Sequence, residues 1–540
     1  MLKVVGASWL QTRISTYILI AVALLGVGAI IFGEFGHVEQ DGTYSATVSW
    51  NRKGGYRIDF WGQGNDLSAV PFHAARAYYK TGIFEHGWSY IEIETSSKYP
   101  DTVQAYAAGL LEGSLTWQLI HHHWYNTIRP ECEAKPAECQ KLKHYLRDNT
   151  AIIREYAELK EANDPFWHMV RLFYMQLDGL EAGWKFAVRR SRVSVSLEHE
   201  DFLWLALASD LPGFQQVFNI SEPPMSSTIF FKLLPIGNSD PLIAIGQQTT
   251  APYTQMLRLL KKYTFGYHVS PTIKTAALTP GRSIVMSSYP GALSSRDEFY
   301  LMYGENRELV VAGTPLLVTN RSEWSFLYPK DYVMLTVKLM AANRLATGSQ
   351  SWFNTMSHPN GGASAMQWIS FEPRSMNVLL MEQLPKITVG TNYTEDFRKN
   401  GFISYVGLSN FQCIRDTVQP GKKDANLTKT CLTRLENVTT LEKFGSMMRG
   451  CSQEDRAQNL KISDPLQKLT ERKDLDDDEA PYGVIDTKIF AIGVDGIESF
   501  EVTSGPSTMF KWSESFPNIS HVGHPDTFNF ESVTPKWVWI

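Results

Sequence analysis

The segment Pro224-Met-Ser-Ser-Thr-Ile-Phe-Phe-Lys-Leu-Leu-Pro235 begins the central structural pattern of this 540-residue chain. Its apolar run, Ser227–Leu234, is followed by a second run, Pro241–Ile245, and Gly237-Asn238 lies between them. Two apolar runs joined by a short turn containing glycine are typical of a β-hairpin. The pattern therefore predicts a buried hairpin that follows a polar, proline-containing and exposed segment at Asn219–Pro224.

Helical and strand-like patterns are clustered on either side of this hairpin. Alternation and glycine turns predict short strands over 42–100, and apolar residues at helical spacing predict helices over 102–127, 166–184 and 202–208. Beyond the hairpin, the pattern predicts a helix with Tyr253, Met256, Leu257 and Leu260 on one face, a hairpin over 299–303 and 308–312, a helix over 331–347 that ends at Gly348, strands at 378–381 and 484–489, and a charged loop over 452–479. Clustered elements of this kind indicate an α+β fold with sheets layered against helices.

Composition narrows the class of protein. Hydrophobic residues make up 43% of the chain and aromatic residues 12%, which favours a large packed body over disorder. The formal net charge is -5 and no basic stripe is present, so nucleic acid is excluded as the expected partner.

The N-terminus carries a targeting pattern. Lys3 and Arg13 precede an uncharged run over 14–33, and Glu34 and Asp41 follow it. About 20 apolar residues can span a bilayer, and the positive charge before the run predicts a cytosolic segment over 1–13. Two readings stay open: an uncleaved signal-anchor, which would make a type II membrane protein with a lumenal body, and a cleaved signal peptide.

Sequons and cysteines agree with the secretory route that both readings imply. In an oxidising compartment, Cys132 and Cys139 are expected to form a disulfide around Pro136, while the pairing of Cys413, Cys431 and Cys451 stays open. The glycosylation sequons begin at Asn219, Asn320, Asn392, Asn426, Asn437 and Asn518.

Common catalytic and metal-binding motifs do not explain the chain. His121-His122-His123 would point in three directions about 100° apart on a helix, so these side chains are not expected to share one ion. The sequence has neither a H-E-x-x-H motif nor a G-x-S-x-G motif, and the cysteine spacing does not resemble a zinc site. We therefore expect no metal and no cofactor.

Several segments together resemble the phospholipase B-like (laminin ancestor-like) family, in the family's order from about residue 100 to the C-terminus. They include Leu111–Gln118, Gln176–Glu181, Lys232–Pro235, Met256–Tyr263, Ser288–Tyr300, Ala342–Ala346, Glu382–Pro385, Ala480–Lys488 and Gly523–Asp526. The resemblance implies an N-terminal-nucleophile hydrolase with an αββα sandwich that matures by autoproteolysis. It also implies a lipid-like substrate and a lysosomal or secreted protein.

The resemblance places the nucleophile at Ser227. The family has a cysteine at the start of this strand, and counting back from Lys232 without gaps puts Ser227 at that position. Autoproteolysis between Ser226 and Ser227 would free an α-amine that serves as general base to the same residue. The resemblance then divides one globular body into an N-terminal part over 34–226 and a nucleophile-bearing part over 227–540.

Other positions depart from the family's pattern. The family's His-Asp/Asn-Thr-Trp, Ala-Ser-Tyr-Asn and Tyr-Asn-Asn-Gln-Trp motifs appear here as Gln247–Thr250, Ile403–Val406 and Ser364–Trp368, and Thr428 and Lys429 stand near an expected arginine. Because removal of one oxyanion donor typically lowers the rate by about 10²–10³, these departures favour a weakened or inactive site. Three hypotheses stay open: an active hydrolase, a non-catalytic lumenal binding or structural protein, and a serine hydrolase with a separate triad.

Overall fold

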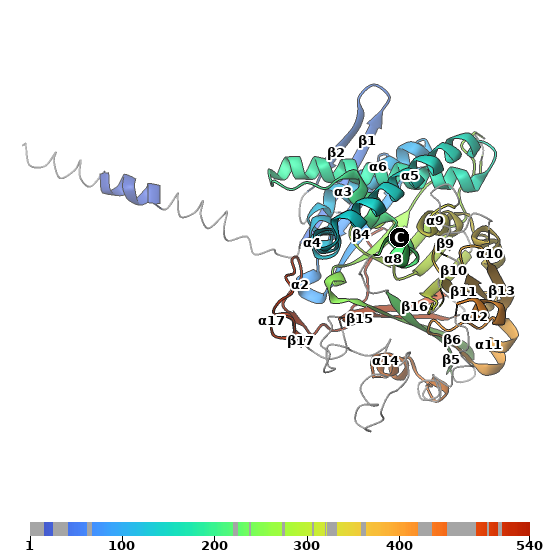
Figure 1. Ribbon diagram of the computed structural model, residues 1–540. Helices are drawn as coiled ribbons and strands as arrows, with labels where there is room; N and C mark the ends of the chain where they lie inside the picture. The colour runs from blue at the N-terminus through green and yellow to red at the C-terminus, as the bar shows by residue number, and fades with distance from the viewer. Residues whose placement is uncertain are drawn as a thin grey trace, which may run out of the picture. The chain divides into compact units, whose positions relative to one another are not determined.

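Two β-sheets lie face to face at the centre of the computed structural model (Figure 1). The structure describes residues 16–24, 42–61, 67–219, 225–236, 239–272, 276–304, 307–318, 320, 324, 332–357, 363–418, 435–450, 482–493, 496–505 and 510–539. The described residues from Thr43 onward form one compact unit, and residues 16–24 belong to a separate unit, Met1–Gly42.

The larger sheet has the strand order β13-β12-β11-β10-β9-β8-β7-β4-β3-β1-β2. Its described strands pair antiparallel except β4 with β7, which are parallel and join the four N-terminal strands to the rest. The bounds are β1 Thr43–Asn51, β2 Gly55–Phe60, β3 Ala75–Lys80, β4 Trp88–Thr95, β7 Arg258–Thr264, β8 Ser283–Ser288, β9 Phe299–Gly304, β10 Arg307–Pro315, β11 Met366–Glu372, β12 Asn377–Gln383 and β13 Thr388–Asn392.

The smaller sheet has the order β14-β5-β6-β15-β16 and is antiparallel throughout its described strands. Its bounds are β5 Ser226–Ile236, β6 Ser239–Pro252, β14 Phe402–Tyr405, β15 Tyr482–Gly493 and β16 Gly496–Ser504, and a separate short pair is formed by β17 Phe510–Lys511 and β18 Thr527–Phe528. β5 and β6 form the hairpin predicted over 227–245, which is confirmed.

The described helices lie on both sides of β5 in the sequence, with the longest before it. They are α2 Ile83–His86, α3 Asp101–Leu115, α4 Trp117–Ala134, α5 Pro136–Lys160, α6 Pro165–Ser191, α7 His199–Ala206, α8 Leu211–Phe218, α9 Leu335–Leu345, α10 Ser349–Met356, α11 Thr394–Asn400, α12 Gln412–Val418, α14 Leu441–Gly450 and α17 Trp512–Ser515, with 3-10 turns η1 Leu67–Ala69, η2 Ala208–Asp210 and η3 Tyr253–Gln255.

Apolar clusters show how these elements are layered. Side chains from both sheets, among them Ile229 and Phe231 of β5 and Val310 of β10, form the core between the sheets. Helices that include α3, α6 and α9 pack on the outer face of the larger sheet, and α14 packs on the outer face of the smaller one. The predicted α+β class is confirmed, with the site segment on an inner strand.

Three predicted elements are wrong in detail. Tyr253–Leu260 is not a helix, because η3 is followed by β7, whose apolar residues are buried on both sides of a central strand. The helix predicted over 102–127 is interrupted at Thr116, whose φ of -104° and ψ of 15° separate α3 from α4. Gly348 does not end the helix predicted over 331–347, because α9 ends at Leu345 and Gly348 precedes α10.

Helix α5 was not predicted, although Leu142, Leu146, Ile153 and Ala157 are buried at helical spacing along it. Its first turn carries the predicted disulfide between Cys132 and Cys139, which is confirmed with a Cα–Cα distance of 5.1 Å. Cys413 is exposed and has no disulfide partner among the described residues, and Cys431 and Cys451 lie outside them.

The N-terminal targeting prediction is described only in part. Residues 16–24 are helical, and the rest of the predicted segment 14–33 lies outside the described residues, as does the charged stretch 452–479. Within the described ranges, no helix combines the length and the apolar character needed to cross a bilayer. The signal-anchor and the signal peptide therefore stay predictions.

Candidate functional site

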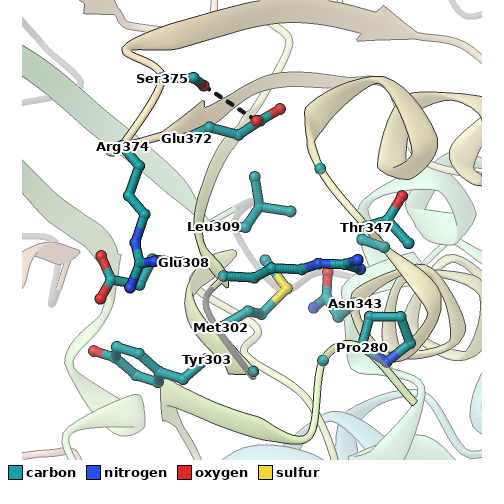
Figure 2. Close-up of a pocket in the computed structure, with 15 residues that line it drawn as sticks. Pro280, Met302, Tyr303, Glu308, Leu309, Asn343, Thr347, Glu372, Arg374 and Ser375 are labelled. Carbon is teal, nitrogen blue, oxygen red and sulfur yellow. Dashed lines mark hydrogen bonds between the residues drawn. The ribbon is translucent and has the colours of Figure 1, made fainter. Parts of the chain in front are cut away.

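Ser227 lies at the start of β5, between the two sheets. It pairs across the strand with Thr249 of β6, and Thr249 in turn pairs with Asp486 of β15. Ser227 is buried, with 5% of its surface exposed. It does not line the cavity of Figure 2, nor a smaller one beside His123 and Tyr289.

Thr314 of β10 holds the backbone of Ser227. The Thr314 hydroxyl accepts the Ser227 N–H over 3.1 Å and donates to the Ser227 carbonyl over 2.7 Å. Thr314 is fully buried and belongs to the larger sheet, so this contact joins the two sheets at the first residues of β5. Because one hydroxyl satisfies both backbone groups, the orientation of Ser227 is fixed.

The Ser227 hydroxyl faces the backbone carbonyl of Asp297. It donates to this oxygen over 3.5 Å, the outer limit of a hydrogen bond, whereas Gln247 Nε2 donates to the same oxygen over 2.7 Å. Glu298 follows with a φ of 59°, a conformation uncommon for residues with a side chain, and it turns the chain directly after Asp297. Burial raises the pKa of Glu298 to about 8, so this carboxyl is mostly uncharged at neutral pH.

Four fully buried charged side chains adjoin this position: Arg258, Asp297, Asp486 and Lys488. Arg258 contacts both carboxylates, and Lys488 Nζ lies 2.6 Å from Asp486 Oδ1 and 3.5 Å from Asp297 Oδ2. Burial alone would raise the pKa of the Asp297 carboxyl, but Arg258 and Lys488 outweigh it and hold that pKa below its usual range. Two positive and two negative charges therefore balance inside the protein.

The cluster reaches the strand position opposite Ser227. Lys488 Nζ donates to the hydroxyl of Thr249 over 2.8 Å. Asp486 and Lys488 stand two residues apart on β15, so both side chains project from the same face of the strand. Tyr289 donates its hydroxyl to Asp297 Oδ1 over 2.8 Å, and its ring lies 4.1 Å from the Arg258 guanidinium carbon. The carboxylate beside the candidate nucleophile is thus held by several donors.

The other predicted site positions have mainly structural contacts. Gln248 points to the other side of the smaller sheet and donates to the Met448 carbonyl of α14. Gln367 donates to Glu382 over 2.8 Å, and Trp368 is fully buried against Trp352. Val406 is half-buried directly after β14, whose Ile403–Tyr405 pairs with β5, whereas Thr428 and Lys429 lie outside the described residues.

Five residues of this site were not predicted as functional: Thr314, Asp297, Arg258, Asp486 and Lys488. A signal was present for three of them, because charged residues interrupt largely apolar segments at Arg258, Asp486 and Lys488, whereas Asp297 stands between Arg296 and Glu298 in a polar run. Buried charges require partners, so such positions indicate a buried cluster. Thr314 gave no signal, because a threonine is ordinary in a strand.

The histidines do not join this site. His121, His122 and His123 lie on α4, and no cluster of three potential metal-ligating side chains exists within the described ranges. The Ser227 hydroxyl makes no hydrogen bond to a histidine in the part of the chain that the structure describes. This geometry gives no support to a separate serine–histidine–carboxylate triad.

His123 provides a test of the buried electrostatics next to the cluster. Burial, together with the charges of Arg296, Arg258 and Lys261, lowers the pKa of His123 to about 3. In the unfolded chain this imidazole titrates near its ordinary value of 6.5, so the unfolded state gains a proton first as the pH falls. The folded state is therefore destabilised below pH 6.5, by about 2 kcal/mol at pH 5 from this group alone.

Replacing His123 by phenylalanine should remove that contribution while keeping the ring stacked on Tyr289, whose centroid lies 5.4 Å away. We expect His123→Phe to gain about 2 kcal/mol relative to the parent protein between pH 7.5 and pH 5. Denaturant unfolding at both pH values measures the difference. Parallel stability profiles for the two proteins would contradict the buried neutral imidazole.

Ser227 thus starts an inner strand between the two stacked sheets of an α+β protein, beside a buried charged cluster. A family model described as Phospholipase B matches residues 75–535, which include every residue of this site. The chain belongs to the phospholipase B family.

Several phospholipase B-like proteins are similar to this chain over most of their length. A phospholipase B-like lamina ancestor protein of Drosophila melanogaster is 32% identical, with 100% of both chains covered. Phospholipase B-like 2 of Homo sapiens is 27% identical over 86% of each chain, and phospholipase B-like protein B of Dictyostelium discoideum is 26% identical over 86% of each chain.

Proposed function

We propose that this chain is a phospholipase B-like hydrolase that cleaves an ester or amide bond of a lipid-like substrate, with Ser227 as its nucleophile. Family membership supports a lipid-like substrate. The succession of helices, two facing sheets and α14 supports the N-terminal-nucleophile hydrolase fold that the sequence resemblance implies. The mechanism requires no cofactor, because one residue supplies both nucleophile and base.

The observation that carries this proposal is the double contact between Thr314 and the backbone of Ser227. In an N-terminal-nucleophile mechanism, the nitrogen of the nucleophilic residue becomes the general base after the preceding peptide bond is cut. Thr314 Oγ1 lies 3.1 Å from that nitrogen and also holds the adjacent carbonyl. A freed amine would keep its position, and its pKa of about 7.7–8.0 suits proton transfer near neutral pH.

Maturation would proceed by an acyl shift at the Ser226–Ser227 bond. Ser227 Oγ attacks the carbonyl carbon of Ser226, an ester to Oγ forms, the C–N bond breaks, and the hydroxyl proton passes to the leaving nitrogen. Water then hydrolyses the ester, which leaves a carboxylate on Ser226 and a free amine and hydroxyl on Ser227. The same hydroxyl would next attack the substrate carbonyl, with the amine as base.

The burial of Ser227 favours a second candidate function, that of a non-catalytic lumenal binding or structural protein. Ser227 is 5% exposed, and Gln247 makes the shorter hydrogen bond to the Asp297 carbonyl. Val406 also offers no side-chain donor at the position where the phospholipase B-like pattern has an asparagine. On this candidate, the chain stays uncut and turns over no lipid.

Release of fatty acid from phospholipid–detergent micelles separates the two candidates. The assay uses the full chain produced through the secretory pathway, at several pH values. Time-dependent release in proportion to the fraction of cleaved protein supports the hydrolase. Absence of fatty-acid release at any pH would overturn that function, and a chain that is also uncut would favour the non-catalytic candidate.

The proposed location is the secretory pathway, with a lysosomal, secreted or type II membrane end point. It predicts glycans, which are attached to an asparagine side-chain nitrogen. Asn320 is half-buried, and its Nδ2 donates to the Thr417 carbonyl over 3.0 Å, so we expect little modification there. The other described sequon asparagines are exposed: Asn219, Asn392, Asn437 and Asn518.

Glycopeptide mass spectrometry of the secreted protein measures the occupancy of each sequon. We expect the four exposed asparagines to carry glycans at several times the occupancy of Asn320. Equal occupancy at Asn320 would show that this side chain is accessible before the fold closes over it, and an unmodified chain would contradict the secretory location. Asn426 lies outside the described residues and stays a sequence prediction.

A further inference from the structure

A cavity of about 110 Å³ lies at the β9–β10 hairpin, and Ser227 does not line it. Figure 2 shows its walls, which come from the hairpin, from the corner between α9 and α10, and from the turn between β11 and β12. None of the residues that contact Ser227 lines this cavity. The cavity is therefore separate from the Ser227 site and is lined by different residues.

Asn343 lines this cavity and has an unused donor. The residue is fully buried, and its Oδ1 accepts the indole N–H of Trp352 over 2.8 Å. Its Nδ2 has no hydrogen-bond acceptor within the described part of the chain. Buried side-chain donors almost always have a partner in folded proteins, so an oxygen atom from a bound molecule would complete this site.

Arg307 supplies positive charge on the same cavity. It forms no ion pair with any described residue, and neither does Arg374, a second cation of the lining. Figure 2 shows the side chains of Arg374 and Glu308 directed toward one another, so Glu308 partly offsets the charge of Arg374. No acid of the lining is left to pair with Arg307, because Glu308 is directed toward Arg374 and Glu372 has other partners.

The remaining acid, Glu372, is engaged in the fold. Its Oε1 accepts the backbone N–H of Ser349 over 2.6 Å at the start of α10, and its Oε2 accepts the Ser375 hydroxyl over 3.2 Å, as the dashed line in Figure 2 marks. A carboxylate at a helix N-terminus is stabilised there and is a poor ligand for a second cation. The lining thus carries two arginines and two acids, and Arg307 and Asn343 keep donors that have no acceptor among the described residues.

We propose that this cavity binds a phosphate group, with Arg307 and the Asn343 amide as donors to its oxygens. Arginine is well suited to phosphate because its guanidinium presents parallel N–H donors. A volume of about 110 Å³ holds a tetrahedral oxyanion, since one water takes about 30 Å³ in the liquid. Met302 and Leu309 add apolar wall, which suits a carbon substituent on the phosphate.

Calorimetric titration of the full chain tests the site, with inorganic phosphate and glycerol 3-phosphate as probes at constant ionic strength. We expect saturable binding of both probes. A higher affinity for glycerol 3-phosphate than for inorganic phosphate would indicate a phosphate ester as the natural ligand, and equal affinities would indicate free phosphate. Arg307→Gln should weaken binding at least tenfold. Asn343→Asp should abolish it, because the acceptor for Trp352 is kept while the donor is replaced by a negative charge.

Arg57→Gln is the matched control, because Arg57 is exposed on β2, pairs there with Asp59 and does not line the cavity. Its binding should equal that of the parent protein. Arg307 is exposed, so Arg307→Gln should fold normally even if Asn343→Asp does not. The site is overturned if the parent protein binds neither probe, or if Arg307→Gln binds as tightly as the parent.

Discussion

Replacing Ser227 by alanine should leave one uncut polypeptide and lower fatty-acid release by at least about 10³-fold, since loss of a catalytic nucleophile has effects of this size or greater. The physical reason is that the same hydroxyl is needed twice, first to cut the chain and then to attack the substrate. The fold should be unchanged, because the Thr314 contacts involve only the backbone of this residue. A denaturing gel and the micelle assay measure both effects.

Two further variants sharpen this test. Unlike Ser227→Ala, Ser227→Cys should still cut the chain, because a thiol provides a much stronger nucleophile than a hydroxyl near neutral pH. Ser226→Ala is the matched control, since the side chain of the preceding serine takes no part in the acyl shift. Cleavage of Ser227→Ala at the parent rate would assign the cut to another protease and remove Ser227 from the mechanism.

Replacing Arg258 by methionine should destabilise the protein by about 3–5 kcal/mol, the usual cost of removing one partner from a buried ion pair. The guanidinium contacts Asp297 and Asp486, and all three side chains are fully buried. Without it, two carboxylates share the single positive charge of Lys488. Denaturant unfolding followed by tryptophan fluorescence measures the loss, and poor recovery of soluble protein would accompany it.

The double variant Arg258→Met/Asp297→Asn separates charge from packing. It restores one positive and one negative charge to the cluster, so it should recover part of the lost stability. Arg398→Met, on the exposed surface of α11, should change stability by less than about 0.5 kcal/mol. An Arg258→Met protein as stable as the parent would contradict the buried cluster.

Local sequence was enough to predict the hairpin that carries Ser227. The first apolar run is bounded by Pro224 and Gly237, which limit where its strand can begin and end, and Gly237-Asn238 separates it from the second run. The disulfide between Cys132 and Cys139 was predictable for a similar reason, because the two residues are close in sequence. The resemblance to a family added the role of Ser227, which composition and spacing could not supply.

Non-local contacts set the limit of the sequence prediction. The segment Arg258–Thr264 combines leucines with three cations, a pattern that fits a helix as well as a strand. It forms a central strand because distant acids pair with its cations, such as Glu112 with Lys261 and Asp486 with Arg258. The contact of Thr314 with Ser227 likewise depends on how two sheets pack, and neither segment encodes it alone.

The first residue of the C-terminal fragment tests the central claim most directly. Intact-mass and N-terminal peptide analysis of the mature protein should find a fragment that begins at Ser227 with a free α-amine, accompanied by one that ends at Ser226. A chain that is continuous from Ser226 to Ser227 in a fully secreted protein, or a fragment that begins at another residue, would contradict the proposed N-terminal nucleophile.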